Sequence, residues 1–347
     1  MMRTSEPAEA GNFSVPATSA NKSRFAHEVG KYAYPSAVIS AVAVAMLFPE
    51  HFVQINGFQL QNLIVPLLQI IMVGVGCTMS WRDLVGVLKM PKAVLVGVAS
   101  TYAIMPLAAF TIARIFRFPP EIAAGLVLVG CCPSGLASNV IALLAKANVP
   151  LSVTVTTVST LLAPLATPLL MKVLGGGFIH VEVGSMIFDM VKLVVVPISA
   201  GVLLNRVFET KTRLVMKLMP AMSMTGIAAI IVIITAAGRY SLLHVGAGLL
   251  VAVFLHMALG FAVGYTCAQL CGLAEEDCRT ISIEVGMQNG GLASGIAMQM
   301  GRVATMGLAA AIKGPVMNLT FSLLGTWWGK RPPKKRTAPS TAAERPQ

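Results

Sequence analysis

The chain has 347 residues, of which 56% carry apolar side chains and 12% carry charged ones, and its mean hydropathy is +0.77. Water-soluble domains carry about twice that fraction of charged residues. The composition therefore excludes an ordinary soluble globule, a disordered chain and a disulfide scaffold. The formal net charge is +12. In so apolar a chain, we interpret this charge as a signal of membrane topology and not as a surface that binds nucleic acid.

Apolar runs follow one another along most of the chain, separated by short polar breaks. Each run is long enough to supply roughly the 20 residues with which a helix spans the hydrocarbon core of a bilayer. The sequence therefore predicts an all-α polytopic membrane protein with ten transmembrane helices, at residues 33–49, 59–79, 92–116, 121–146, 149–173, 183–205, 215–237, 242–271, 275–301 and 304–327.

The two ends of the chain lack such runs. We expect residues 1–30 to form a disordered cytoplasmic tail, because they have no apolar core of a cleavable signal peptide. Residues 328–347 are expected to form a basic cytoplasmic tail. With both ends inside, 19 of the 26 lysines and arginines fall in inner loops and tails and five in outer loops. This distribution obeys the positive-inside rule, and we expect a multi-pass protein of the cell (inner or plasma) membrane.

A short motif recurs in the two halves of the chain. Residues 134–140 read SGLASNV and residues 290–296 read GGLASGI. Five predicted spans separate the two copies, so the second copy would enter the membrane in the opposite orientation. The sequence thus predicts two inverted five-helix repeats, at residues 31–173 and 174–327, an arrangement common in secondary transporters.

The fourth and ninth spans each contain residues that interrupt helices. CCPSGLASN at 131–139 includes Pro133, which lacks a backbone donor, and EVGMQNGGLASG at 284–295 contains clustered glycines. Backbone freed from helical bonds is tolerated at membrane depth only against protein or a water-filled cavity. Two such breaks at corresponding positions predict one shared polar site. The alternative is a pair of flexible hinges that bind no ligand.

Glu284 lies beside the second break, where a carboxylate is costly unless it has a function. Hydroxyl and amide side chains of spans 4, 5 and 9 could surround it with oxygens suited to a monovalent cation. Among them, Ser152, Thr156 and Ser159 are spaced by four and three residues, which places them on one face of a helix. The half-helices that begin near Leu136 and Gly291 would direct their positive ends at the same cavity and favour an anion. A cation cage beside an anion site indicates symport. A protonated or salt-bridged Glu284 with a purely structural role is the alternative.

The motifs GCCPSGLASN, NVPLSVTVTTVSTLLAP and IEVGMQNGGLA resemble the signature segments of the bile acid:sodium symporter family. The resemblance covers nearly all of residues 31–327, in span order. It implies a bacterial-type member in which the broken helices 4 and 9 cross at the membrane centre. It also implies a first sodium site whose ligands would be Ser138, Asn139, Ser152, Thr156 and Glu284.

A second sodium site is implied less completely. In relatives it uses oxygens that fall here on Glu284, Val285, Met287 and Gln288, together with a glutamine on the third helix. The segment VGVASTYAIMP places Thr101 at the position of that glutamine. Because threonine is two bonds shorter, we expect the second site to be incomplete unless a water molecule or a neighbouring serine fills the gap.

Lys313 is a further departure from the family pattern, about 13 Å into the tenth span at 1.5 Å per residue. Three interpretations are open: the lysine snorkels to an interface or pairs with Glu284; it replaces one sodium ion; or it binds a substrate carboxylate directly. Leu136 falls where relatives often present a threonine to the substrate. Candidate substrate-binding residues are Leu136, Asn139, Asn289, Gly290, Gly291 and Lys313.

From these features we expect a secondary active transporter that couples uptake of a small organic anion, such as a bile acid-like, pantoate-like or 2-oxo acid, to sodium by alternating access. Expected partners are this anion and the lipid bilayer, with no nucleic acid, and the protein is expected to be monomeric. Sodium would be the coupling ion, without other cofactors. The alternative is a proton-coupled or sodium-independent carrier or exporter on the same fold. An enzyme is not expected, because no span carries a nucleophile with a base.

Overall fold

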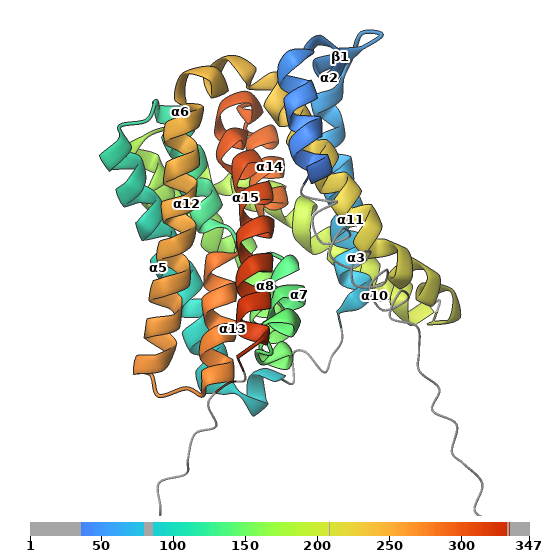
Figure 1. The fold of residues 1–347 in the computed structure, drawn as a ribbon. Coiled ribbons are helices and arrows are strands. Elements are labelled where there is room, and N and C mark those ends of the chain that lie inside the picture. The colour runs from blue at the N-terminus through green and yellow to red at the C-terminus, as the bar shows by residue number, and fades with distance from the viewer. Residues whose placement is uncertain (1–35, 80–85, 208, 332, 334–347) are drawn as a thin grey trace, which may run out of the picture.

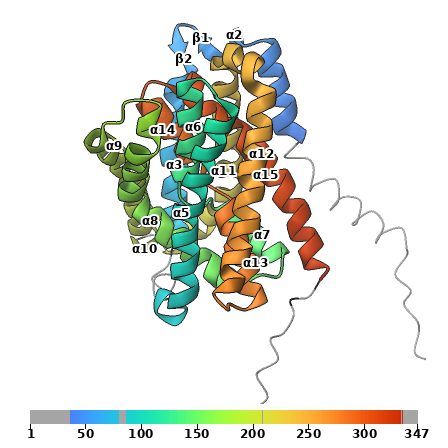
Figure 2. The same ribbon diagram turned by 90° about the vertical axis from the view of Figure 1, so that its left-hand side faces the viewer.

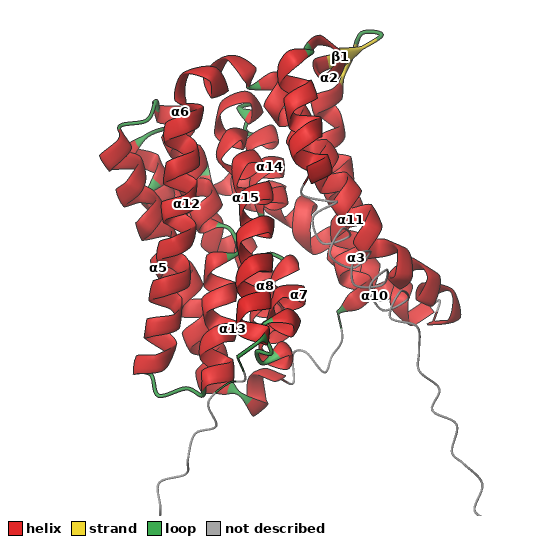
Figure 3. Cartoon of the chain, in the orientation of Figure 1, coloured by secondary structure: helices red, strands yellow, loops and turns green. Residues whose placement is uncertain are grey.

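A computed structural model describes residues 36–79, 86–207, 209–331 and 333 (Figures 1 and 3). The predicted N-terminal tail and residues 334–347 of the predicted C-terminal tail lie outside the described residues. The described chain is mostly helical, as the sequence predicted. Its helices in chain order are Ser36–Leu47, α2 (Glu50–Val53), α3 (Ile64–Thr78), α5 (Pro91–Phe116), α6 (Pro120–Cys131), α7 (Ala137–Leu144), α8 (Val149–Val173), α9 (Val183–Met190), α10 (Val196–Val207), α11 (Glu209–Ala237), α12 (Arg239–Leu270), α13 (Glu275–Gly286), α14 (Gly290–Gln299) and α15 (Val303–Gly329).

Six helical segments among the described residues are long and apolar enough to cross a membrane. They are Leu60–Thr78, α5, Val149–Gly177, Val183–Val207, α12 and α15. Shorter apolar helices occupy Ser36–Leu47, α6 and Met222–Ala237. Many large apolar side chains remain exposed on these helices. Because water would penalise such a surface, it indicates contact with lipid.

Two of the predicted spans are interrupted where the sequence predicted. Helix α6 ends at Cys131 and α7 begins at Ala137, while α13 ends at Gly286 and α14 begins at Gly290. The first half-helix of each pair has 12 residues. At the first break, Thr167 Oγ1 donates to the Cys131 carbonyl at 2.7 Å. A side chain of α8 thus satisfies a carbonyl that the ended helix leaves without its usual partner.

Helices α3, α10 and α11 pack together at one side of the molecule, and α5 to α8 with α12 to α15 form the larger part (Figures 1 and 2). The contact between α3 and α10 is very close. A Cβ atom at Gly76 would collide with the Ile198 carbonyl, and one at Gly201 with the Val73 carbonyl. Glycine is therefore required on both helices, and the close approach joins them into one packed unit.

Two local features depart from the predicted all-α pattern. A two-stranded antiparallel hairpin joins β1 (Gln54–Ile55) to β2 (Phe58–Gln59), turning through Asn56 and Gly57 at positive φ. Apart from Gln59, this hairpin lies in the break between the first two predicted spans, where no helix was predicted, and its Asn-Gly turn favours a tight hairpin. The second feature is a π-helical turn, η3 (Val191–Val195), within the segment Val183–Val207.

Candidate functional site

The two helix breaks cross each other and are joined by main-chain hydrogen bonds. Gly135 N donates to the Met287 carbonyl at 2.8 Å, and Asn289 N donates to the Pro133 carbonyl at 2.8 Å. Ser134 and Gln288 thereby form an antiparallel bridge. A Cβ at position 135 would lie 3.1 Å from the Gln288 carbonyl oxygen, so glycine permits this close approach. The predicted pair of breaks therefore meets at one place.

Ser134 adds side-chain bonds to this crossing. Its Oγ donates towards the carbonyl oxygens of Glu284 at 3.0 Å and Met287 at 3.2 Å. These carbonyls belong to the end of α13, where helical partners are lost. Sequence reasoning did not select Ser134, although its place between Pro133 and Gly135 in the first break was a usable signal.

Glu284 is completely buried and receives hydroxyl groups from α8. The hydroxyl oxygen of Ser152 lies 2.5 Å from Glu284 Oε1, and Thr156 Oγ1 lies 2.8 Å from Oε2. Ser152 and Thr156 are four residues apart and share one helix face, as their spacing predicted. Ser159, predicted on the same face, donates instead to the Thr156 carbonyl of its own helix.

The remaining members of the first predicted ligand set lie in the same cluster. Ser138 Oγ is 3.3 Å from Thr156 Oγ1, and the Ser152 hydroxyl is 2.8 Å from Asn139 Oδ1. Ser138, Ser152 and Thr156 are buried. The structure therefore brings one carboxylate, three hydroxyls and one amide oxygen together from α7, α8 and α13. Such a set of hard, weakly charged oxygens is suited to a monovalent cation.

The second predicted ligand set is arranged differently. Gln288 Nε2 donates to the Val285 carbonyl, and Gln288 Oε1 accepts from Lys313 Nζ. The hydroxyl of Thr101 donates to the Gly97 carbonyl of its own helix at 3.0 Å. Lys313 is 1% exposed, which argues against the interpretation in which it snorkels to an interface. Its partner is Gln288, and no ion pair among the described residues joins it to Glu284.

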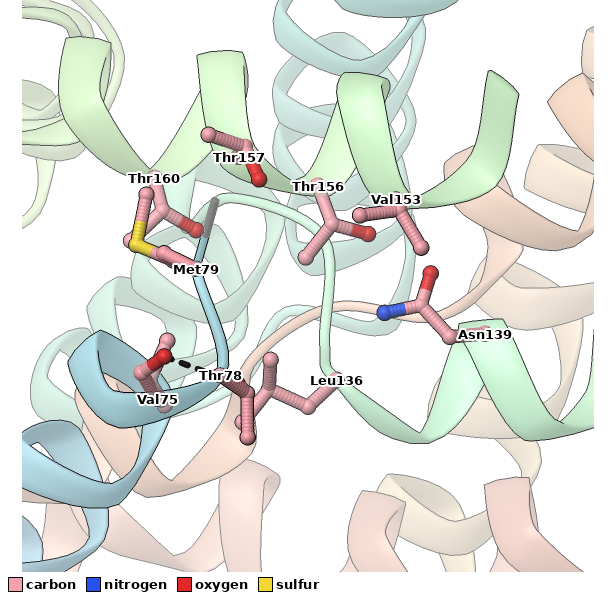
Figure 4. Close-up of a pocket in the computed structure, with 9 residues that line it drawn as sticks. All are labelled: Val75, Thr78, Met79, Leu136, Asn139, Val153, Thr156, Thr157 and Thr160. Carbon is pink, nitrogen blue, oxygen red and sulfur yellow. Dashed lines mark hydrogen bonds between the residues drawn. The ribbon is translucent and has the colours of Figure 1, made fainter. Parts of the chain in front are cut away.

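A pocket opens beside the carboxylate cluster, between α3 and the start of α7 and α8 (Figure 4). The amide nitrogen of Asn139 points into it, while the Asn139 oxygen faces α8. Thr156 belongs both to the pocket wall and to the carboxylate cluster. The lining residues are Val75, Thr78, Met79, Leu136, Asn139, Val153, Thr156, Thr157 and Thr160.

Of the predicted substrate-binding residues, Leu136 and Asn139 line this pocket. Asn289 instead caps α14, its Oδ1 accepting from Leu292 N at 3.0 Å. Gly290 packs towards Ala310 of α15, and Gly291 towards Leu68 of α3. Lys313 is bonded to Gln288 and is absent from the described pocket lining. The structure therefore separates the predicted set, with two members in the pocket and the rest at the crossing.

The wall supplied by α3 was missed in the sequence. Val75, Thr78 and Met79 lie at the C-terminal end of that helix, opposite Leu136 (Figure 4). Thr78 donates to the Val75 carbonyl at 2.8 Å, as threonine often does in a helix. Nothing in the local sequence distinguishes this threonine from a structural one, and only the fold brings it to the site.

Interrupted helices crossing at a buried polar cluster, among helices long enough to span a bilayer, define a polytopic membrane protein with an internal polar centre. Residues 65–245 match the profile described as Sodium Bile acid symporter family. A Bacillus subtilis protein named an uncharacterized sodium-dependent transporter, YocS, is 38% identical over 86% of this chain and 91% of its own length. The chain belongs to the sodium bile acid symporter family, a family of sodium-dependent transporters.

Two more distant relatives cover similar parts of the chain. The probable sodium/metabolite cotransporter BASS1 of Arabidopsis thaliana chloroplasts is 32% identical over 90% of this chain and 77% of its own length. The human ileal sodium/bile acid cotransporter is 30% identical over 75% of this chain and 76% of its own. All three relatives are named as transporters.

Proposed function

We propose that this protein is a secondary active transporter that couples the inward movement of a small organic anion to sodium. The observation that carries the proposal is the buried carboxylate of Glu284 within a cluster of hydroxyl and amide oxygens. No described ion pair supplies it with a cationic partner. A buried charge is costly without compensation, so a cation from solution is its natural partner. The proposed sodium ligands are Ser138, Asn139, Ser152, Thr156 and Glu284.

The pocket between α3 and α7 is the proposed anion site. The Asn139 amide nitrogen would donate to the anion, and the Asn139 oxygen accepts from Ser152, which joins it to the carboxylate cluster. Sodium bound at Glu284 would neutralise the carboxylate and fix the orientation of Asn139, thereby improving the anion site. The two ligands then raise each other's affinity by the same factor, as linkage requires.

The remaining parts of the proposal concern architecture. Ten membrane-spanning segments would form two inverted repeats, with the interrupted helices α6–α7 and α13–α14 as equivalents. Their equal first halves of 12 residues and the repeated Gly-Leu-Ala-Ser motif support this assignment. Both termini would be cytoplasmic, in the cell membrane, and transport would proceed by alternating access.

The test is the thermal stability of the purified protein in sodium chloride and in choline chloride at equal ionic strength, with a panel of carboxylates. We expect sodium to raise the melting temperature and to lower the concentration at which an active carboxylate adds a further shift. Glu284→Gln should abolish the sodium effect. A carboxylate response that is unchanged by sodium but strengthened at acid pH would refute sodium coupling and favour a proton-coupled carrier.

A further inference from the structure

Lys313 lies in the middle of α15, at the level of the helix crossing. One turn before it, Ala310 packs against Gly290 at the start of α14; further along, Phe321 fills the space beside Gly286 at the end of α13. Lys313 thus faces the break between these two half-helices. At 1% exposure it is among the largest fully buried side chains of the described chain.

The ammonium group of Lys313 is bonded to a side chain of the segment that crosses the first break. Its Nζ donates to Gln288 Oε1, and Gln288 is the residue that bridges Ser134. The other oxygens nearby are also bonded to protein donors: the Val285 carbonyl to Gln288 Nε2, and the Met287 carbonyl to Gly135 N. Each of these three oxygens therefore has a protein donor as a partner.

The formal charges of the buried side chains in the described chain add up to nearly zero once ion-paired groups are set aside. Apart from His256, three buried residues of the described chain have side chains that commonly carry a charge: Arg279, Glu284 and Lys313. Arg279 is paired with Glu275 at 2.9 Å. Glu284 and Lys313 have no such partner among the described ion pairs and carry opposite formal charges. Glu284, near the end of α13, contacts hydroxyls of α8, whereas Lys313, on α15, contacts Gln288 in the break that follows α13. Without ligands, their formal charges cancel.

We propose, resting on the sodium coupling proposed above, that the Lys313 ammonium is a counter-cation of the crossing that the chain itself supplies, so that a single sodium ion accompanies each substrate anion. With sodium on Glu284, the formal charge of the crossing becomes +1, which complements a monocarboxylate in the adjacent pocket. Lys313 and sodium would repel each other across the break, so the lysine also lowers the affinity for sodium while raising that for the anion.

The experiment measures sodium binding to the purified full-length protein, using ²²Na⁺ for stoichiometry and melting temperature against sodium chloride for the midpoint. Ionic strength is held constant with choline chloride. Lys313→Met keeps the length and apolar stem of the side chain and removes its charge, and Lys313→Arg keeps the charge. Lys192→Met, which removes an exposed lysine stacked on Phe188, is the matched control.

We expect one sodium ion per wild-type protein and a midpoint for Lys313→Met lower by about tenfold or more, because a buried repulsion is removed. The sodium midpoints of Lys313→Arg and Lys192→Met should stay within about threefold of the wild-type midpoint. A threefold change corresponds to about 0.7 kcal/mol. A lysine with only a structural role would instead weaken sodium binding when replaced.

Two sodium ions bound per wild-type protein would overturn the inference, and this result does not depend on any variant. An unchanged or raised sodium midpoint in Lys313→Met would also overturn it, provided that the wild-type protein binds sodium. In both cases the proposed sodium coupling would stand. Absence of sodium binding in wild type together with Lys313→Met would overturn the proposed function and the inference with it. Sodium binding that appears in Lys313→Met and not in wild type would support the role of Lys313 as a counter-cation and would refute sodium coupling in the wild-type protein.

Discussion

The hydroxyl residues of α8 show how neighbouring side chains of the same type acquire different tasks. Ser152 and Thr156 reach the Glu284 carboxylate, whereas Ser159 bonds a carbonyl of its own helix. Spacing alone predicted all three on one face. It could not show which of them reach the carboxylate, because a buried hydroxyl has a local backbone acceptor available in every helix.

We predict that Ser152→Ala raises the midpoint of the sodium-dependent increase in melting temperature by about 10-fold or more. A hydrogen bond to a charged group contributes about 1.5–3 kcal/mol, and the change also removes a proposed sodium ligand. Ser159→Ala is the matched control, a buried serine of the same helix without contact to Glu284. Equal midpoints in the two variants would contradict the assignment of Ser152.

At the residue scale, the sequence predicted the oxygens around Glu284 well and the surroundings of the pocket poorly. The five residues of the first predicted set lie in one cluster because two breaks and one helix face bring them together. Of the missed residues, Ser134 had a usable signal in its place between Pro133 and Gly135, whereas the α3 wall at Thr78 reaches the pocket only through the fold and leaves no local pattern. Gln288 and Lys313 were predicted separately, and their bond became visible only in the fold.

At the scale of elements, the crossing depends on backbone approach. The strand after α6 lies so close to the strand before α14 that Gly135 faces the Gln288 carbonyl directly. Proline and glycine gave clear signals for both breaks, since they remove helical donors or relax the chain. The π-helical turn η3 and the hairpin of β1 and β2 were not predicted, because apolar periodicity does not report such local changes.

We predict that Gly135→Ala lowers the stability of the purified protein by about 1–3 kcal/mol, because the new Cβ must displace the Gln288 carbonyl. The sodium midpoint should rise as well, since the crossing positions Glu284. Melting temperature and sodium titration measure both effects. Gly184→Ala, whose Cβ would meet nothing within 4 Å, should be neutral or slightly stabilising. If Gly135→Ala has the melting temperature and sodium midpoint of wild type, the two crossing segments can move apart at this position without loss of stability or sodium binding.

For the whole molecule, the proposed stoichiometry determines how transport responds to voltage. One sodium ion carried with one monoanion moves no net charge, whereas two sodium ions would move one. Each net charge gains about 2.3 kcal/mol per 100 mV, which corresponds to a roughly 50-fold difference in the equilibrium accumulation of the anion. The sequence predicted the helical membrane character of the chain because composition and run length suffice for it. The charge balance at the crossing required the position of Lys313 in three dimensions.

We predict electroneutral uptake in proteoliposomes of the carboxylate selected by the thermal-stability panel. Uptake should require a sodium gradient and should remain unchanged when a potassium gradient with valinomycin imposes an inside-negative potential. Solid-supported membrane recordings provide the second measurement. A sodium-dependent current evoked by the carboxylate would contradict the prediction and indicate that more than one sodium ion enters with each anion.

The joint between Ser134 and Gln288 has a consequence for how such a protein can diversify. Its two 2.8 Å bonds are made by main-chain atoms, and they persist whichever side chains project from either strand, provided glycine remains at position 135. Substitutions at Val75, Met79 and Leu136 would therefore change the apolar wall of the pocket and leave the proposed sodium site behind it in place. On the proposed mechanism, the choice of substrate and the coupling to sodium could then evolve separately.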